Sequence, residues 1–406
     1  YADVPQTDDS TAQDWQAVDR RGLVIEGPAD PSLAVIDCGG KGGIRLESKA
    51  SFLSGVTFRN FLTTKGSGPA LSVVSGAASN VVCDAGLLTG TVNQPCVYVG
   101  DVSLVTDAVI ENLNGTVSGC KVANVVGGTL RRTTVRNCTA TASAMITGDA
   151  SSGGSRAKFE DCVFTGNTQS GSSIFSINRT DATGCKLGHN TITSKGYELV
   201  WTQESTLTDC ALTNNTAKGT LLVNTVWGSG GTRIKNSLIA HNDNGSWAAV
   251  FNPYTSSRMW LENCTIAWNK STSGAAGGLD GVADSYDSFI DIKNTIVAGN
   301  TVGSKVIDTS AKHKTYNNRR FTYSAFAEAA KYPDAHNVAD PLMKKNCKLK
   351  RLSPCRDTGT PLSWHEGGHD LDGNPRIIDS KLNLGGGVDM GCYECPPGTG
   401  ALLFVR

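Results

Sequence analysis

The sequence predicts an all-β chain, a right-handed parallel β-helix of about 11 or more coils followed by a C-terminal closing segment. The first observation behind this fold is a seven-residue phrase that returns along the chain. Its second residue stands at positions 162, 185, 210, 237, 264 and 295, so the period varies from 23 to 31 residues. The second is that apolar and polar residues alternate inside each copy, which indicates strands, because a helical repeat needs a 3.6-residue period. The third is the glycine content, 46 of 406 residues, which suits a chain that turns more than once per coil.

Each position of the phrase has a structural meaning in stacked coils. The second residue is small and the fourth is apolar, and each is expected to form an inward column. The seventh is asparagine, which tolerates left-handed backbone at a turn and can bond its counterpart in the next coil, as in a ladder. The three predicted columns are Cys162, Cys185, Cys210, Ser237, Cys264 and Thr295; Phe164, Leu187, Leu212, Ile239, Ile266 and Val297; and Asn167, Asn190, Asn215, Asn242, Asn269 and Asn300.

The repeat divides the chain into three segments. Looser copies run back to residues 23–25, so residues 1–305 are assigned to the coils. Residues 306–339 break the pattern, and a short helix predicted over 321–331 would cover the last coil and end before Pro333. Residues 340–406 form the closing segment.

Charge and hydropathy exclude two classes of partner. Lys and Arg number 37, and so do Asp and Glu, so the zero net charge gives no field to recruit nucleic acid or an anionic membrane. No apolar run reaches the length of about 20 residues that a membrane-spanning helix needs, so membrane insertion is not expected.

The two ends of the chain suggest that it is a segment. Residues 1–9 lack the apolar core of a leader, and residues 401–406 resemble the start of a strand. We therefore expect the chain to be part of a larger polypeptide.

Four blocks near the C-terminus carry a resemblance to a known family. They are DPL at 340–342, RLSPCRDTG at 351–359, DLDGNPR at 370–376 and VDMGCYE at 388–394. In this order they resemble the C-terminal signature of bacterial secreted right-handed β-helix repeat proteins, which have a DP-F, S-P-A-x-D-x-G, D-x-D-G-x-x-R and V-D-x-G-x-Y-E series. The resemblance implies an extracellular or cell-surface protein with a pectate-lyase-like fold.

The 13 cysteines divide into two groups. Those of the repeated phrase share a column with Ser237 and Thr295, so that position needs a small side chain, and most of these cysteines are expected to be buried thiols. The family signature has a small residue such as alanine where Cys355 and Cys392 stand here, and replacing both suggests a disulfide between them in an oxidising compartment. Cys392 and Cys395 form a lone C-x-x-C pair, which is weak evidence of redox chemistry.

Residues for catalysis are not evident in the repeats. Parallel β-helices often carry enzymes of acidic polysaccharides, which need a basic residue beside a calcium site, or paired carboxylates. The RIK triplet at 233–235 resembles that of polygalacturonases, yet the accompanying blocks are missing, so no catalytic, cofactor-binding or metal residue is assigned. Asp370, Asp372 and Asn374 offer oxygen ligands for calcium, but the same turn also forms without metal, and both interpretations stay open.

Tryptophans gather in one part of the chain. Five of the seven lie between residues 201 and 268, at Trp201, Trp227, Trp247, Trp260 and Trp268. Two interpretations are open. In one, these tryptophans present aromatic faces to a glycan; in the other, Trp201 continues a packed column with Phe175, Val223 and Phe251. We favour the packed column, because like residues stack on one another in these folds.

Together these features predict an extracellular structural or adhesive module that self-associates, for instance into fibres, or contacts neighbouring modules of the same polypeptide. The alternative is a polysaccharide lyase or glycoside hydrolase acting on acidic polysaccharides. Glycans are a further candidate partner, and no cofactor is expected apart from the calcium considered above. We favour a non-enzymatic role, because the position that recurs most strongly carries asparagine and small residues rather than acids.

Overall fold

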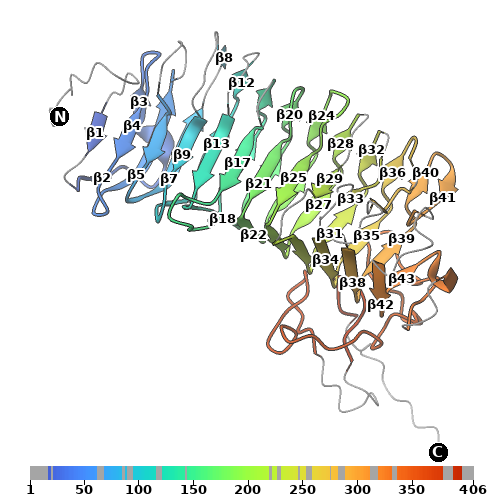
Figure 1. The fold of residues 1–406 in the computed structure, drawn as a ribbon. Coiled ribbons are helices and arrows are strands. Elements are labelled where there is room, and N and C mark those ends of the chain that lie inside the picture. The colour runs from blue at the N-terminus through green and yellow to red at the C-terminus, as the bar shows by residue number, and fades with distance from the viewer. Residues whose placement is uncertain are drawn as a thin grey trace, which may run out of the picture.

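The chain folds as a parallel β-helix, so the predicted fold class is confirmed (Figure 1). The computed structural model describes residues 17–19, 22–61, 68–84, 87–88, 95–115, 121–141, 144–218, 222–225, 230–245, 247–252, 258–274, 276–281, 289–310, 319–331, 336–377 and 387–395. Short strands wind into coils that stack into long sheets along an elongated rod. Among the strand pairs of the described residues, β40–β41 alone is antiparallel.

Sheet I has 11 strands. They are β1 (Ala17–Asp19), β4 (Ile44–Leu46), β6 (Leu71–Val73), β9 (Pro95–Val99), β13 (Lys121–Val126), β17 (Ile146–Asp149), β21 (Phe175–Asn178), β25 (Val200–Gln203), β29 (Val223–Thr225), β33 (Val250–Asn252) and β37 (Leu279–Gly281).

Sheet II consists of two columns of strands, IIa and IIb, which meet at a tight turn; β5 (Phe52–Arg59) and β7 (Ala77–Asp84) run through both columns. Column IIa also contains β2 (Val24–Glu26), β10 (Leu104–Thr106), β14 (Thr129–Arg131), β18 (Ala157–Glu160), β22 (Thr180–Thr183), β26 (Thr206–Thr208), β30 (Thr232–Lys235), β34 (Arg258–Glu262), β38 (Phe289–Lys293) and β42 (Arg319–Thr322). Column IIb also contains β3 (Val35–Asp37), β11 (Val109–Glu111), β15 (Thr134–Arg136), β19 (Val163–Thr165), β23 (Lys186–Gly188), β27 (Ala211–Thr213), β31 (Leu238–Ala240), β35 (Thr265–Ala267), β39 (Ile296–Ala298) and β43 (Ala325–Phe326).

Sheet III is made of two-residue strands. They are β8 (Leu87–Leu88), β12 (Asn114–Gly115), β16 (Thr139–Ala140), β20 (Thr168–Gln169), β24 (Thr191–Ile192), β28 (Thr216–Ala217), β32 (Asp243–Asn244), β36 (Lys270–Ser271), β40 (Thr301–Val302) and β41 (Lys305–Val306). The described helical segments are two single 3-10 turns, η1 (Pro31–Leu33) and η2 (Ala329–Lys331). No helix in the described ranges has the length and apolarity needed to cross a membrane.

The inward stack predicted from the fourth position of the phrase is confirmed. Its six residues are at most 1% exposed and lie in register on neighbouring strands of column IIb. Phe164 also contacts Phe159 of column IIa and Phe175 of sheet I, with ring centroids 6.2 and 5.2 Å away. One apolar core therefore joins the sheets across each coil, and each fully buried side chain of this size contributes about 1.5–3 kcal/mol.

The predicted asparagine ladder is confirmed, and every polar atom of its side chains is satisfied. Oδ1 of Asn215 accepts hydrogen bonds from the backbone N–H and the Nδ2 of Asn190, at 3.0 Å each. Its own Nδ2 donates to the carbonyl oxygen of Leu187 (2.9 Å) and to Oδ1 of Asn242 (3.0 Å). The same pattern recurs along the buried ladder. A coil cannot shift without breaking these buried bonds, so the ladder fixes the register of the stack.

The asparagine ladder and the column of small residues both end at side chains from the segment that follows the coils. These side chains accept the last hydrogen bonds of each series. Asp308 takes the place of the next ladder asparagine, and its Oδ1 accepts from the backbone N–H and Nδ2 of Asn300 at 2.8 and 3.1 Å. In the small-residue column, the backbone N–H of Thr295 donates to Oγ of Ser324, and the N–H of Ser324 donates to Oδ1 of Asn337, at 3.1 Å each. Residues 306–339 therefore supply the acceptors that the last regular coil needs.

The helix predicted over 321–331 is wrong. Strands β42 and β43 pair with β38 and β39, so the chain makes another coil there, and only η2 is helical. Phe321 and Phe326 are 3% and 0% exposed, with ring centroids 4.3 Å apart, and this burial outweighs the helix propensity of the neighbouring alanines. Val338 then hydrogen-bonds to Phe326 and Ser324 and covers the edge of this coil.

Cysteines of the repeated phrase are buried free thiols, as predicted. The thiol of Cys162 lies 3.3 Å from the carbonyl oxygen of Leu130, and that of Cys264 lies 3.2 Å from that of Ile234. Burial raises the pKa of Cys264 to about 12, so its reactive thiolate is scarce at neutral pH. These cysteines fill space in the core.

The closing segment lies against the outer side of the last coils and not across the end of the rod (Figure 1). A second apolar cluster joins the two parts. Its buried members are Leu238, Ala240, Ala267, Ile296, Ala298 and Ala325 of the rod, and Met343, Cys347, Leu349, Cys355, Met390 and Cys392 of the segment. Outer positions of column IIb in earlier coils include exposed charged residues, such as Arg136 and Lys186. The outer face thus becomes apolar where the segment covers it.

Arg376 anchors the closing segment to the rod and forms a buried ion pair with Glu394 inside the segment. The side chains of Arg376 and Glu394 are 0% and 2% exposed, and Nη1 lies 2.8 Å from Oε1. Arg376 also donates to Oδ1 of Asn236 on the rod and, at 3.0 Å, to the carbonyl oxygen of Gly391. Glu394 accepts from the backbone N–H of Asp389 at 3.0 Å. The blocks that carry the family resemblance therefore act here as docking elements.

Stacked turn asparagines on the rod receive these elements. Asn236, Asn263 and Asn294 adopt left-handed φ values of 46–50° at the turn between columns IIa and IIb. Oδ1 of Asn263 lies 2.8 Å from Nε2 of His365, whose Nδ1 accepts the backbone N–H of Leu362 at 3.0 Å. Burial lowers the pKa of His365 to about 4, so the imidazole is neutral at neutral pH, and Nε2 is its donor to Asn263.

The disulfide suggested between Cys355 and Cys392 is not formed in this structure. Both cysteines are separate, buried thiols. They belong to the second apolar cluster, and burial raises the pKa of Cys355 to about 12. The bridge stays a prediction for the oxidised protein.

Substituting Asn215→Ala should lower the free energy of unfolding by about 2–4 kcal/mol, because buried groups on Asn190, Leu187 and Asn242 lose their partners. Urea denaturation followed by circular dichroism measures the effect. Thr213→Ala, on the outer side of the same coil, is the control and should cost less than about 1 kcal/mol. Equal losses in the two variants would contradict a special role for the ladder.

Substituting Arg376→Met should release the closing segment, because it removes the hydrogen bonds of Arg376 to Asn236 and Gly391 and leaves the buried Glu394 carboxyl without its partner, at a cost of about 3–5 kcal/mol. Limited proteolysis should then cut within residues 340–395 while the circular dichroism of the coils persists. Arg351→Met, at an exposed position, should leave the cleavage pattern unchanged. Resistance of the Arg376→Met variant to proteolysis would show that Arg376 does not hold the segment.

Candidate functional site

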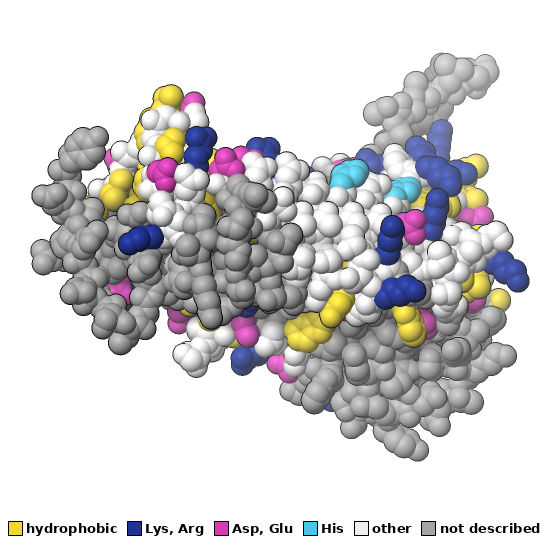
Figure 2. All heavy atoms as spheres, turned by 90° about the horizontal axis from the view of Figure 1, so that it is seen from above, with side chains coloured by type: hydrophobic (Ala, Val, Ile, Leu, Met, Phe, Trp, Pro, Cys, Tyr) yellow, Lys and Arg dark blue, Asp and Glu magenta, His cyan; other side chains and the backbone are white. Residues whose placement is uncertain are grey.

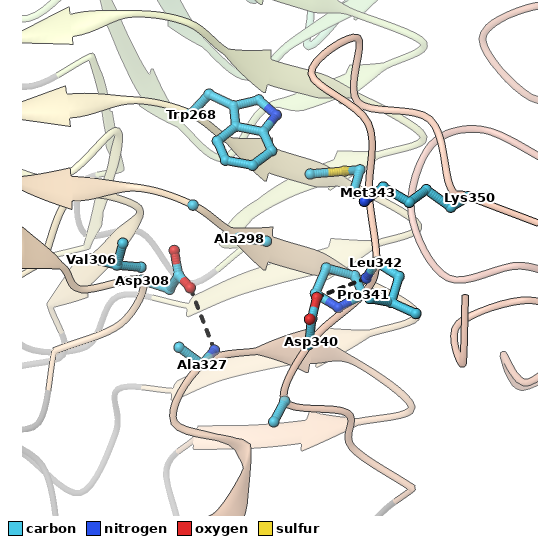
Figure 3. Close-up of a pocket in the computed structure, with 12 residues that line it drawn as sticks. Trp268, Ala298, Val306, Asp308, Ala327, Asp340, Pro341, Leu342, Met343 and Lys350 are labelled. Atoms are coloured by element: carbon cyan, nitrogen blue, oxygen red, sulfur yellow. Dashed lines mark hydrogen bonds between the residues drawn. The ribbon is translucent and has the colours of Figure 1, made fainter. Parts of the chain in front are cut away.

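A pocket of ≈ 270 Å³ lies where the last coils, the β40–β41 hairpin and the closing segment meet (Figure 3). Trp268 comes from the rod, Asp308 follows the hairpin, and Asp340, Met343 and Lys350 come from the closing segment. Pockets for drug-sized ligands are typically about 300–1,000 Å³. This one therefore suits a small group, such as one sugar residue of a polymer.

Trp268 occupies a strained position at the edge of this pocket. It is the turn residue after β35 and has a left-handed φ of 58°. The same turn carries Gly166, Asn214 and Gly299 in other coils, which are residue types that adopt this conformation more easily. A Cβ on Gly299 would overlap the indole, so that glycine makes room for the ring. Bulky residues held in this way are concentrated at functional sites.

The indole of Trp268 offers both a face and a hydrogen-bond donor. Nζ of Lys345 lies 4.2 Å from the ring centroid, within the range of a cation–π contact. The indole Nε1 is buried and has no hydrogen-bond partner, although buried donors are normally paired. In Figure 3 this nitrogen is on the side of the ring that faces Met343.

Asp308 brings a buried carboxyl group to the pocket. It is 2% exposed, and the ladder holds its Oδ1 while Oδ2 accepts a long bond of 3.4 Å from the backbone N–H of Ala327 (Figure 3). Burial raises the pKa of Asp308 to about 6, an effect that its hydrogen bonds to Asn300 oppose. A carboxyl group with such a pKa can release and regain a proton in mildly acidic solution.

Asp340 supplies a second carboxyl group, in different surroundings. It is exposed, and its Oδ1 accepts the backbone N–H of Leu342 at 2.8 Å (Figure 3). The closing segment also brings positive charge, since residues 344–356 contain six Lys or Arg and no Asp or Glu. Lys350, one of the six, lines the pocket.

The arrangement combines the parts of a site for an acidic sugar. The buried carboxyl group, with its raised pKa, is suited to act as an acid, and the exposed carboxyl group is suited to act as a base. A tryptophan provides a flat amphipathic surface. Lysines favour a ligand that carries negative charge.

Structural placement separates the tryptophans that the sequence groups together. Phe175 and Val223 are buried and share an inward register through Val200, but Trp201 is the next residue along its strand and is half-buried on the outer face. The prediction that Trp201 belongs to this packed column is therefore wrong. Trp260 lies on the outer face of column IIa, with the guanidinium of Arg233 3.9 Å from its ring centroid, and Trp247 is exposed. Trp227 and the side chain of Phe251 lie outside the described residues.

The other candidate motifs do not meet at the pocket. In the RIK triplet at 233–235, Arg233 and Lys235 lie over Trp260 and Trp364, and Ile234 is buried in the core. Within the described ranges, no group of three or more His, Cys, Asp or Glu side chains is placed to hold a metal ion.

The turn considered for calcium uses its central carboxylate internally. The oxygens of Asp370 accept the backbone N–H groups of Asp372, Asn374 and Glu394, and the Nδ2 of Asn374, at 2.7–2.9 Å. The carboxylate of Asp372 pairs with Lys348. These contacts favour the interpretation in which the turn forms without metal.

Sequence reasoning missed Asp308 and Asp340, because both lie outside the repeated phrase. One signal could have pointed to Asp308: the ladder needs an acceptor after Asn300, and Asp308 follows eight residues later. No comparable signal exists for Asp340, which reaches the pocket only through the docking of the closing segment.

No protein-family model matches the sequence, and no curated protein is similar to it. Among solved structures, the A-module of mannuronan C-5 epimerase AlgE6 from Azotobacter vinelandii is 10% identical, with a TM-score of 0.37, over 71% of this chain and 87% of that one. Pectate lyase Pel9A is 11% identical, with a TM-score of 0.33, over 93% and 77% of the two chains. XylC, solved with xylose, is 11% identical with a TM-score of 0.33 over 57% of this chain, which spans only 43% of XylC. At these values the similarities assign neither activity nor substrate.

Substituting Asp308→Asn should stabilise the protein more at pH 7.5 than at pH 4. Well below pH 3.8 the carboxyl is protonated in the folded and unfolded chains alike. Between pH 3.8 and about 6 the unfolded chain releases the proton while the folded wild type keeps it, so wild-type stability falls, and above about 6 the whole loss is present. A pKa of about 6 instead of 3.8 corresponds to at most roughly 3 kcal/mol, which the neutral amide avoids while it keeps the ladder acceptor.

Thermal unfolding of the wild type and Asp308→Asn across this pH range measures the difference. Asp340→Asn, at the exposed carboxyl, is the control and should show no such trend. A melting-temperature difference between wild type and Asp308→Asn that is the same at both pH values would contradict the assigned pKa.

Proposed function

We propose that this chain is a glycoside hydrolase that cleaves an acidic polysaccharide at the Trp268 pocket. The observation that carries the proposal is the pair of carboxyl groups, Asp308 buried and Asp340 exposed, which line one pocket beside a tryptophan. This supports the alternative function given by the sequence over the adhesive role.

In this mechanism Asp308 is the general acid. Its proton passes to the glycosidic oxygen as the bond between that oxygen and the anomeric carbon breaks. Asp340 is the general base and removes a proton from the water molecule that attacks the anomeric carbon. The products are two shorter chains, one with a new reducing end, and proton exchange with solvent restores both carboxyl groups. Direct attack by water inverts the configuration at the anomeric carbon.

The ladder has a direct role in this chemistry. Because Oδ1 of Asp308 accepts two hydrogen bonds from Asn300, the carboxyl group is held in one orientation, with Oδ2 left for the proton. A group that is positioned before substrate binds needs little reorganisation during the reaction.

Positive charge supports an acidic substrate. Lys350 lines the pocket and Lys345 lies over the Trp268 ring, so a sugar carboxylate would meet ammonium groups on the closing segment. The zero net charge of the chain still argues against general attraction to polyanions, so this selectivity is local. We place the protein outside the cell, where such polymers are found, in agreement with the resemblance of its C-terminal blocks.

Incubation with polygalacturonate or alginate should release reducing ends, and Asp308→Asn or Asp340→Asn should lower kcat by about 100-fold or more, because each removes one proton-transfer step. Asp243→Asn, at an exposed position on β32, is the matched control and should leave kcat unchanged. Reducing-end assays with each variant measure these effects.

Other products, or none, would indicate a different function. Unsaturated sugars would indicate a lyase and contradict the roles given to the two aspartates. Binding of the polymer without any product would contradict catalysis and favour the adhesive role.

A further inference from the structure

Trp268 belongs to a line of turn residues that runs along the rod. At the turn between column IIb and sheet III, successive coils carry Gly166, His189, Asn214, His241, Trp268 and Gly299. All six have left-handed φ values, between 57° and 69°. Four side chains thus stand in a row between two glycines, and the row leads to the pocket.

The ladder holds this row rigid. Each turn residue directly precedes a ladder asparagine, and its backbone N–H donates to a carbonyl oxygen of the next coil: His189 to Thr213 at 3.3 Å and Trp268 to Ala298 at 3.2 Å. The distance between neighbouring turn residues is therefore the coil spacing, about 4.8 Å. A regular series of side chains is presented without the mobility of a long loop.

The row is open to solvent and rich in hydrogen-bonding groups. His189, Asn214 and His241 are exposed, and together they offer imidazole and amide donors and acceptors. Figure 2 shows histidine side chains on the same face of the rod as a group of Lys and Arg side chains near its C-terminal end. Exposed lysines lie on neighbouring strands, Lys186 on β23 and Lys270 on β36.

The closing segment flanks the end of the row nearest the pocket. Nε2 of His241 lies 2.9 Å from the carbonyl oxygen of Lys345, whose Nζ lies over Trp268. Row and pocket are therefore parts of one continuous surface.

We propose that His189, Asn214, His241 and Trp268 form a binding track for a linear polysaccharide lying parallel to the rod axis, with about one sugar residue beside each coil. The inference rests on the proposed function for the identity of the polymer. A polymer of regular repeat close to the coil spacing meets an equivalent polar group at each coil, whereas a compact ligand would contact only one or two.

The test compares acidic oligosaccharides of increasing length. His189→Gly/Asn214→Gly removes two side chains and keeps the turn, since glycine already occupies it in other coils. The variant should bind hexagalacturonate about 5- to 20-fold more weakly than the wild type and bind digalacturonate equally well, because two sugar residues, at about one per coil, are too few to reach from the pocket to Asn214. Asn137→Gly is the matched control, because Asn137 has the same turn conformation but lies beyond the gap at Gly166. It should change neither affinity.

Isothermal titration, with Asp308→Asn added to the wild type and to each variant to suppress cleavage, measures binding separately from hydrolysis. A loss of affinity that is confined to the longer oligomer supports the track, even if no cleavage occurs and the proposed hydrolysis fails. Equal affinities of the double variant and the wild type for hexagalacturonate would overturn the track while leaving hydrolysis in the pocket intact. An equal loss for both oligomer lengths, or a loss in Asn137→Gly as large as in the double variant, would also overturn it.

Discussion

The buried amide ladder is the interaction on which the rest of the structure depends. An asparagine placed in an apolar core is costly unless all four of its hydrogen bonds are made, and in this fold they are made only when neighbouring coils are in register. Asn215, bonded to Asn190 on one side and Asn242 on the other, ties three coils together. The ladder therefore selects one register among the many that repetitive strands would otherwise allow.

That requirement also determines what happens where the repeats end. The last asparagine, Asn300, still has a backbone N–H and an amide to satisfy, and no further ladder asparagine follows. Asp308 accepts both bonds, but it buries a carboxyl group, so a structural need produces an ionisable group with a raised pKa. The candidate acid of the pocket is thus the group that terminates the ladder, and the same contacts that hold the fold orient it.

The sequence predicts the structural features that recur from coil to coil and misses those that occur only once. The ladder, the apolar stack and the column of thiols could be predicted because each recurs at a fixed place in a seven-residue phrase. The local sequence around Phe321 and Phe326 favours a helix although the chain makes a coil there, since its ladder position lacks asparagine and alanines dominate locally. Asp340 and Lys350 could not be placed, because a non-repetitive segment reaches the pocket through the contacts of Arg376 with Asn236.

A site at this junction is also where the fold can best tolerate unfavourable features. Trp268 holds a left-handed backbone and an unpaired indole N–H, and Asp308 a buried carboxyl, each of which costs about 1–3 kcal/mol. In a solenoid, stability is approximately a sum over repeats and their interfaces, so uninterrupted coils below the site offset such local costs. At the pocket, the closing segment also adds a second apolar cluster beside the coils.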